Sequence, residues 1–266
     1  MKLVWHISRA DVDRLNAFLS TAASDPLVQA RVATNIAATK VNLSRSAFWH
    51  AMVACLLTTQ QKSGPDSAVA KFIRARPFPL SYHSCAANPP VAPFVTTTLS
   101  KFGGIRRSRK IGYEVGKNLQ TLENGLWDEV LSRINSLLPM ASQKEELEVA
   151  EYLDELLAGI GPKQSRNLLQ GIGFTRYEIP IDSRLIKWLN QFGFPVHLSA
   201  TALADRHYYN FVSTGIQRMC DQAGVFPCVL DAAIFASFDG GRWSKQKAES
   251  WGYDGDQRAQ KRGAQP

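Results

Sequence analysis

The sequence predicts an almost wholly helical protein, and three observations support this fold class. Apolar residues recur at helical spacing in segment after segment. Polar residues that cap helices stand ahead of several of these segments, as Ser142 and Glu145 do with capping-box spacing. Glycines and prolines separate one segment from the next, as expected between helices. The segment after Ser142 shows the apolar spacing clearly, at Leu147, Ala150, Leu153 and Leu157.

The composition favours a globular protein with a polyanionic partner. The chain has 266 residues, of which 45% are hydrophobic, so it can bury a core for one large or two small domains. Its formal net charge is +8 and its pI is near 9.4, which suits a polyanion. No apolar run reaches the roughly 18 residues of a membrane span, and the amino terminus lacks the apolar region of a signal peptide. We therefore expect a soluble, intracellular protein. We also expect a monomer, although no feature of the sequence determines the oligomeric state.

The cysteines and histidines do not predict a metal site. The four cysteines contain no C-x-x-C pair, and the five histidines show no ligand spacing with one another. We expect reduced thiols and no protein-bound transition metal.

The amino-terminal part of the chain predicts a short extended segment and two helices. Residues 1–8 are expected to be extended. The next segment carries Val12, Leu15, Phe18 and Leu19 on one helical face. Pro26 suits the start of a second helix through residue 36. Neither helix carries recognisable chemistry.

The middle of the chain predicts further helices. Ser44 can cap a helix that ends in the sequence LLTTQQ, at Gln60 and Gln61. A helix is expected over residues 63–72, followed by a proline-rich ordered loop. Residues 105–119 are predicted to form a basic helix, which is either a solvated face or a surface that contacts a polyanion. A core helix with Trp127 follows.

A glycine hairpin between two helices is the most informative stretch. Residues 158–161 read Ala-Gly-Ile-Gly and allow a tight turn with exposed amides, and Pro162 suits the first turn of the next helix. Lys163 stands in that turn, where the helix dipole disfavours its ammonium form. Asp182 follows Pro180 at an N-cap position. A lysine and an acid thus both lie at helix amino termini, although each feature alone is common in ordinary structural roles.

The last part of the chain predicts two helices and a tail. A helix is expected over residues 201–222, with its aromatic residues in the core, and another over residues 227–238. Residues 241–266 are polar and glycine-containing, so we expect a basic, flexible tail.

These residues resemble the helix-hairpin-helix DNA glycosylases. The hairpin of that family, L-P-G-[VI]-G-x-K, is similar to residues 157–163, and its V-P-V-D segment is similar to residues 179–182. The interval from Lys163 to Asp182 matches the 8-oxoguanine DNA glycosylase branch without a gap. The resemblance is strong over residues 142–192 and weak elsewhere.

The resemblance implies roles for particular residues. Lys163 would be the Schiff-base nucleophile of a bifunctional glycosylase and AP lyase, and Asp182 the acid beside the sugar. Arg184 would contact a phosphate, with pairing to a nearby carboxylate as the alternative. Gln60, or alternatively Gln61, would fill the space left by an extruded nucleotide.

The resemblance also implies contacts with the hairpin and the base. The amides around Gly159 and Gly161 would contact a phosphate, directly or through a monovalent cation. Asp231 and Phe235 would respectively hydrogen-bond and stack on the flipped base, and Asn167 would line the pocket. The family has different residue types at Asn167 and Asp231, which leaves the identity of the base open.

The resemblance implies two helical subdomains with the hairpin at the cleft between them. Residues 1–44 would pack with the carboxyl-terminal subdomain, 45–140 would form a central subdomain, and 141–240 would hold the hairpin and the carboxyl-terminal subdomain. The expected activity is excision of an oxidised base, 8-oxoguanine first, from double-stranded DNA. The alternatives are another lesion, such as an oxidised pyrimidine, or a non-catalytic DNA-binding module.

Overall fold

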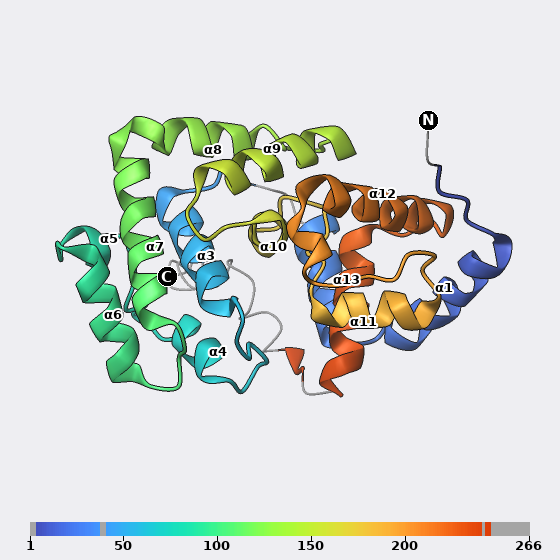
Figure 1. The fold of residues 1–266 in the computed structure, drawn as a ribbon, viewed down its shortest axis with the longest axis horizontal. Helices are drawn as coiled ribbons and strands as arrows, with labels where there is room; N and C mark the ends of the chain where they lie inside the picture. Colours follow the sequence, from blue (N-terminus) through green and yellow to red (C-terminus); the bar gives the residue numbers. More distant parts are fainter. Residues whose placement is uncertain (1–3, 38–40, 241–242, 246–266) are drawn as a thin grey trace, which may run out of the picture.

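The computed structural model describes residues 4–37, 41–240 and 243–245. Within these ranges the chain forms helices joined by turns, with no strand, which confirms the predicted all-α fold class (Figure 1). In chain order the helices are α1 (Arg9–Ala22), α2 (Pro26–Arg31), the π-helical η1 (Val32–Ala37), α3 (Arg45–Thr58), α4 (Ala68–Ile73), α5 (Tyr82–Ala86), α6 (Val91–Phe102), α7 (Ser108–Thr121), the π-helical η2 (Leu122–Leu126), α8 (Trp127–Asn135), α9 (Gln143–Leu156), α10 (Pro162–Gly171), α11 (Ser183–Phe192), the 3-10 turn η3 (Ala202–Ala204), α12 (Arg206–Gln222) and α13 (Pro227–Asp239).

Several helices begin at the capping residues that the sequence predicts. The Ser142 hydroxyl accepts a hydrogen bond from the Glu145 amide and the Glu145 carboxylate accepts one from the Ser142 amide, which forms the capping box of α9. Ser44 caps α3, Asp182 caps α11, and Pro162 occupies the first turn of α10. Each cap satisfies amides that the first helical turn leaves unpaired.

Two predictions for the middle of the chain are wrong. The helix predicted for residues 63–72 begins only at Ala68, because the Ser67 side chain caps its first turn there. The proline-rich stretch predicted to be a loop contains α5 and the start of α6. Ser81 caps α5, and Pro90 occupies the N-cap position of α6. Proline is tolerated at a helix start because the amide it lacks has no partner there.

Two further helices are shorter than predicted. The helix predicted for residues 201–222 is divided into η3 and α12, since Asp205 is extended (φ −75°, ψ 124°) and caps α12. The basic helix predicted for residues 105–119 begins at Ser108. It follows Arg107, whose φ of 62° lies in the left-handed region.

Buried side chains form two large clusters, and the apolar residues of α10 belong to the first. The first cluster joins α3–α9 and the apolar residues of α10. The second joins α1, residues 179–181 and helices α11–α13. In Figure 1, α3–α9 fill one half of the molecule, α1 and α11–α13 the other, and α10 lies between them. The subdomain boundaries at residues 44 and 140 stay predictions, and the packing places α9 and α10 with the central helices.

A third, smaller cluster joins α2, α13 and Trp243. Trp243 is 3% exposed, and its indole N–H donates to Asp239 Oδ2 over 3.0 Å. The prediction of a loosely attached tail from residue 241 is therefore wrong at Trp243, because a large ring is buried there. The rest of the predicted tail, residues 246–266, lies outside the described residues.

Candidate active site

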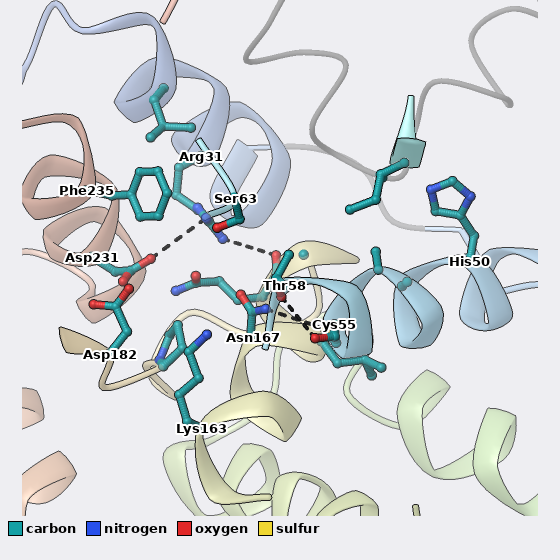
Figure 2. Close-up of a pocket in the computed structure, with 18 of the residues that line it drawn as sticks. Arg31, His50, Cys55, Thr58, Ser63, Lys163, Asn167, Asp182, Asp231 and Phe235 are labelled. Carbon is teal, nitrogen blue, oxygen red and sulfur yellow. Dashed lines mark hydrogen bonds and ion pairs between the residues drawn. The ribbon is translucent and has the colours of Figure 1, made fainter. Parts of the chain in front are cut away.

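A cavity of about 110 Å³ lies where α2, α3, α10 and α13 meet. Five of the predicted site residues line it, and they come from α10, the N-cap of α11 and α13 (Figure 2). They are Lys163, Asn167, Asp182, Asp231 and Phe235. The other predicted residues, Gln60, Gly159, Gly161 and Arg184, do not line it.

Lys163 reaches the cavity from the first turn of α10, directly after the hairpin. The hairpin is held by the side chain of Asn118, whose Nδ2 donates to the Ala158 carbonyl (3.0 Å) and whose Oδ1 accepts from the Ala158 amide (2.7 Å). The Lys163 Nζ atom lies 3.5 Å from Gln164 Oε1. Because the hairpin is fixed, the base of the lysine side chain is fixed as well.

Asp182 enters the cavity from the N-cap of α11. Its Oδ1 accepts hydrogen bonds from the amides of Arg184 (2.9 Å) and Leu185 (3.0 Å). Figure 2 shows the carboxylates of Asp182 and Asp231 and the amine of Lys163 directed into the same space. The arrangement therefore places one amine beside two carboxyl groups.

The buried guanidinium of Arg166 ties the first turn of α10 to the segment that leads to Asp182. Arg166 is 0% exposed. Its Nε donates to Glu178 Oε2 over 2.7 Å, and its Nη1 donates to the Pro162 carbonyl over 3.2 Å. Since Pro162 precedes Lys163, this network joins the chain segments of the amine and the acid.

Tyr209 completes this connection from α12. Its hydroxyl accepts from the Ile181 amide (2.8 Å) and donates to the Ile179 carbonyl (2.7 Å). The Arg166 guanidinium lies 5.0 Å from the centroid of the Tyr209 ring. The extended segment before Asp182 is therefore fixed by both a buried phenol and a buried ion pair.

Asp231 is a buried carboxyl group on α13 that faces the cavity. Its Oδ2 lies 3.8 Å from Nη2 of Arg31. Burial raises the pKa of Asp231 to about 6, with Arg31 acting in the opposite direction and the nearby Asp182 contributing to the rise. The influence of both Asp182 and Lys163 on this group places the three ionisable side chains within electrostatic reach of one another.

Phe235 lies one helical turn after Asp231, and Arg184 covers one face of its ring. The Arg184 guanidinium lies 3.7 Å from the centroid of the Phe235 ring, and its Nη2 lies 3.6 Å from Asp239 Oδ1. Arg184 thus makes the carboxylate pairing that was the alternative to a phosphate contact, and its contact with a phosphate stays a prediction.

Asn167 lies one turn after Lys163 and faces α3. Its Nδ2 is 3.2 Å from Gln164 Oε1 and 3.5 Å from Cys55 Sγ. Burial raises the pKa of the Cys55 thiol to about 12, so this cysteine is a neutral part of the wall and not a nucleophile.

Gln60 and Gln61 differ sharply in their surroundings. The Gln61 side chain donates to the Leu57 carbonyl (2.5 Å) and accepts from the Arg106 amide (2.9 Å). Gln60 is exposed and has a left-handed φ of 56°. The Gln61 side chain is therefore engaged within the protein, whereas that of Gln60 faces solvent at the end of α3.

The two hairpin glycines, Gly159 and Gly161, differ in the space that surrounds them. Gly159 has a φ of 80°, and a Cβ atom there would lie 2.5 Å from the carboxyl carbon of Glu114. Gly161 has open space around it. Glu114 in turn lies 3.8 Å from Arg107, whose Nη1 donates to the Thr59 carbonyl (3.0 Å). The inner side of the basic helix thus supports both the hairpin and the Gln60 loop.

Several cavity residues were missed from the sequence, among them Arg31, Gln170 and Trp243. Arg31 ends a short helix and Gln170 lies in the last turn of α10, positions at which polar residues usually face solvent. Their partners lie far away in the sequence, so no local pattern marks them.

Among the described residues, no group of three His, Cys, Asp or Glu side chains could hold a metal ion. The four cysteines are free and buried. A monovalent cation at the hairpin stays a prediction.

In the described ranges, no single helix is long and apolar enough to cross a membrane. Helices α12 and α13 together have the length and composition of a membrane span, but they are bent by 98° relative to each other.

No protein-family model matches the chain, and no curated protein matches it significantly. Solved structures do match it. The 8-oxoguanine DNA glycosylase of Thermotoga maritima is 14% identical, with a TM-score of 0.62 over 86% of this chain and 96% of that chain. The 8-oxoguanine DNA glycosylase of Methanocaldococcus jannaschii is 16% identical, with a TM-score of 0.64 over 87% and 96%.

The Methanocaldococcus jannaschii 8-oxoguanine glycosylase/lyase has also been solved in complex with a 15mer DNA containing 8-oxoguanine. That structure is 14% identical to this chain, with a TM-score of 0.58 over 87% of this chain and 96% of that one. At these identities the likeness establishes the architecture, which agrees with the all-α fold seen here. The chain has the fold of the 8-oxoguanine DNA glycosylases.

Proposed function

We propose that this chain is a bifunctional DNA glycosylase and AP lyase of the helix-hairpin-helix superfamily that excises 8-oxoguanine. The observation that carries the proposal is one cavity lined by Lys163, Asp182 and Asp231. The shared fold supports it, because the Methanocaldococcus jannaschii glycosylase/lyase of that fold was solved with DNA containing 8-oxoguanine. A DNA substrate also implies an intracellular location.

The proposed reaction begins with extrusion of the damaged nucleotide into the cavity. The hairpin amides near Gly159 and Gly161 hold a backbone phosphate. Gln60 fills the vacated space and hydrogen-bonds the orphaned base, since its side chain is exposed and that of Gln61 is engaged. Asp231 and Phe235 bind the extruded base.

Lys163 and Asp182 then carry out the chemistry. The Asp182 carboxylate first stabilises the positive charge that develops at C1′, and it then takes the proton that Lys163 loses when its amine bonds to C1′. The amine of Lys163 attacks C1′, and the base leaves with the electron pair of the glycosidic bond and gains a proton. The C1′–O4′ bond then breaks and O4′ gains a proton, which opens the sugar ring and leaves an imine between Lys163 and C1′. The imine allows loss of the C2′ proton and cleavage of the C3′–O bond, which releases the 3′ phosphate.

Borohydride trapping on a duplex with 8-oxoguanine tests the reaction. We expect the wild-type protein to form a covalent adduct and Lys163→Gln to form none, because reduction fixes an imine only at the attacking amine. Lys187→Gln is the matched control, since Lys187 is exposed on α11 and does not line the cavity. Absence of an adduct with the wild-type protein would favour the non-catalytic DNA-binding module.

Two further measurements separate the remaining alternatives. A panel of lesion duplexes decides the substrate: removal of thymine glycol with 8-oxoguanine left uncut would favour an oxidised-pyrimidine enzyme. Asp182→Asn keeps a good N-cap for α11 while it removes the charge, so we expect excision to slow by about 100-fold or more. Full activity in this variant would contradict the role of Asp182.

A further inference from the structure

One wall of the cavity carries hydrogen-bond donors that the proposed reaction does not use. Arg31 ends α2 with its side chain 15% exposed. Its Nη1 donates to the Gln170 carbonyl over 3.2 Å, and Asn35 Nδ2 donates to the same carbonyl over 3.1 Å. A guanidinium has five N–H donors, so most of those of Arg31 remain available to a ligand in the cavity.

The side chain of Gln170 provides a second, independent observation. Gln170 is 1% exposed and lines the same cavity. Its Nε2 is one of the few buried polar atoms of the described residues that have no hydrogen-bond partner. A buried, unpaired amide group costs stability, and an incoming acceptor atom would satisfy it.

The acceptor side of the cavity is Asp231. Its carboxylate lies 3.8 Å from Arg31, which is too long for a hydrogen bond and leaves both groups able to bind a third partner. The cavity therefore presents an acceptor and a set of donors next to each other.

The Watson–Crick edge of guanine presents donors and an acceptor in the order that complements the acceptor and donors of the cavity. Its N1 and N2 atoms carry hydrogens, and the neighbouring O6 is an acceptor. We propose that Arg31 and Gln170 donate to O6 of the extruded base while Asp231 accepts from N1 and N2, so that these residues select guanine-type lesions.

This assignment rests on the proposed glycosylase function and adds a criterion for the substrate. An adenine-type base reverses both positions, because N1 is an acceptor and the group at C6 is a donor. It would place an acceptor against Asp231 and a donor against Arg31, and each mismatch leaves buried groups unpaired. Oxidation at C8 does not change this edge. The contact therefore distinguishes guanine from adenine, but it does not distinguish 8-oxoguanine from undamaged guanine.

Single-turnover excision from three duplexes tests the proposal, with 8-oxoguanine, 8-oxohypoxanthine or 8-oxoadenine at the same position. We expect Arg31→Gln to slow removal of the two bases that carry O6 by about 10- to 100-fold, because a charge-assisted hydrogen bond is lost. Removal of 8-oxoadenine should stay unchanged or become faster. Equal slowing on all three duplexes, or slowing on none, would overturn the proposal.

Arg14→Gln is the matched control for Arg31. Arg14 also donates to a carbonyl, that of Phe192 (3.0 Å), and pairs with a carboxylate, that of Asp11 (2.6 Å), but it does not line the cavity. Its substitution should leave all three excision rates unchanged.

Gln170→Leu separates binding from a structural role. Because it removes an unpaired buried amide, we expect it to keep or raise the free energy of unfolding while it slows 8-oxoguanine excision several-fold. A loss of stability together with equal slowing on all three duplexes would show that Gln170 acts only in packing.

Cleavage of a duplex with a preformed abasic site distinguishes failure of this inference from failure of the proposed function. That substrate has no base to contact, so Arg31→Gln and Gln170→Leu should slow its cleavage far less than they slow the excision of 8-oxoguanine. Loss of this activity in Arg31→Gln would show that Arg31 acts only by holding helices together, and it would refute the contact of Arg31 with the base. A wild-type protein that cleaves neither substrate would instead refute the lyase assignment.

Discussion

Asp231 shows how the cavity changes the chemistry of a single residue. Burial raises its pKa to about 6, and the positive charges of Arg31, Lys163 and Arg184 act in the opposite direction. An aspartate with a raised pKa binds protons more readily in the folded than in the unfolded chain. Burying this carboxylate therefore costs stability at neutral pH, which a purely structural residue would have no reason to retain.

We predict that Asp231→Asn changes the pH dependence of stability. The folded wild-type protein binds the additional proton between the unfolded pKa of 3.8 and the folded value of about 6, so its stability falls as pH rises through this window. From about pH 4 to about pH 7, the free energy of unfolding of the variant should shift upward relative to the wild type by up to about 3 kcal/mol.

Urea unfolding of both proteins at several pH values measures this difference. Other carboxyl groups titrate in both proteins and cancel in the comparison, provided that the fold is unchanged. A difference that stays constant with pH would mean that Asp231 titrates normally in the folded protein.

The hairpin and the helices around it show what local sequence determines. Capping residues such as Ser142 and Asp182 act within one helical turn, so the starts of α9 and α11 could be predicted from the sequence. The start of α6 could not, because Pro90 reads as a helix breaker and instead occupies the N-cap position. Whether a proline ends a helix or precedes one depends on tertiary packing, which short stretches of sequence do not record.

We predict a large loss of stability for alanine at one hairpin glycine and almost none at the other. Gly159→Ala should lower the free energy of unfolding by about 1 to 3 kcal/mol, since its φ is 80° and the new Cβ would meet the Glu114 carboxyl group. Gly161→Ala has open space and should change stability by less than about 0.5 kcal/mol.

Gly161→Ala should also change the affinity of the protein for DNA. An added methyl group at Gly161 would stand in open space beside the hairpin amides. If these amides hold a phosphate as proposed, Gly161→Ala should bind duplex DNA several-fold more weakly despite normal stability. Titrations of labelled duplex and urea unfolding measure both quantities. Undiminished affinity would place the phosphate contact elsewhere.

At the scale of the whole molecule, the cavity depends on residues that are far apart in the sequence. Lys163 and Asp182 lie in one short stretch and could be identified by their resemblance to a known family. Arg31, by contrast, approaches Asp231 only because α2 packs on α13, and Trp243 closes the same region. Helical periodicity cannot predict such long-range contacts, so the sequence identified the candidate reacting groups but not most of the surrounding wall.

The net charge of the whole chain leads to a further prediction. A protein of charge +8 that holds DNA through phosphates releases counterions when it binds. If about six or more phosphates are contacted, its affinity for duplex DNA should fall roughly 1,000-fold from about 50 mM to about 200 mM salt. Fluorescence anisotropy across this range measures the slope, and a nearly flat response would contradict phosphate-dominated binding.

The phenol of Tyr209 has a consequence for how this protein can evolve. Its single oxygen pairs with two buried peptide groups, those of Ile179 and Ile181. Phenylalanine would preserve the ring volume but would leave both peptide groups without this hydrogen-bond partner. Smaller polar residues would leave a cavity. Among descendants of this chain, we therefore expect position 209 to remain tyrosine long after its aliphatic neighbours have exchanged for one another.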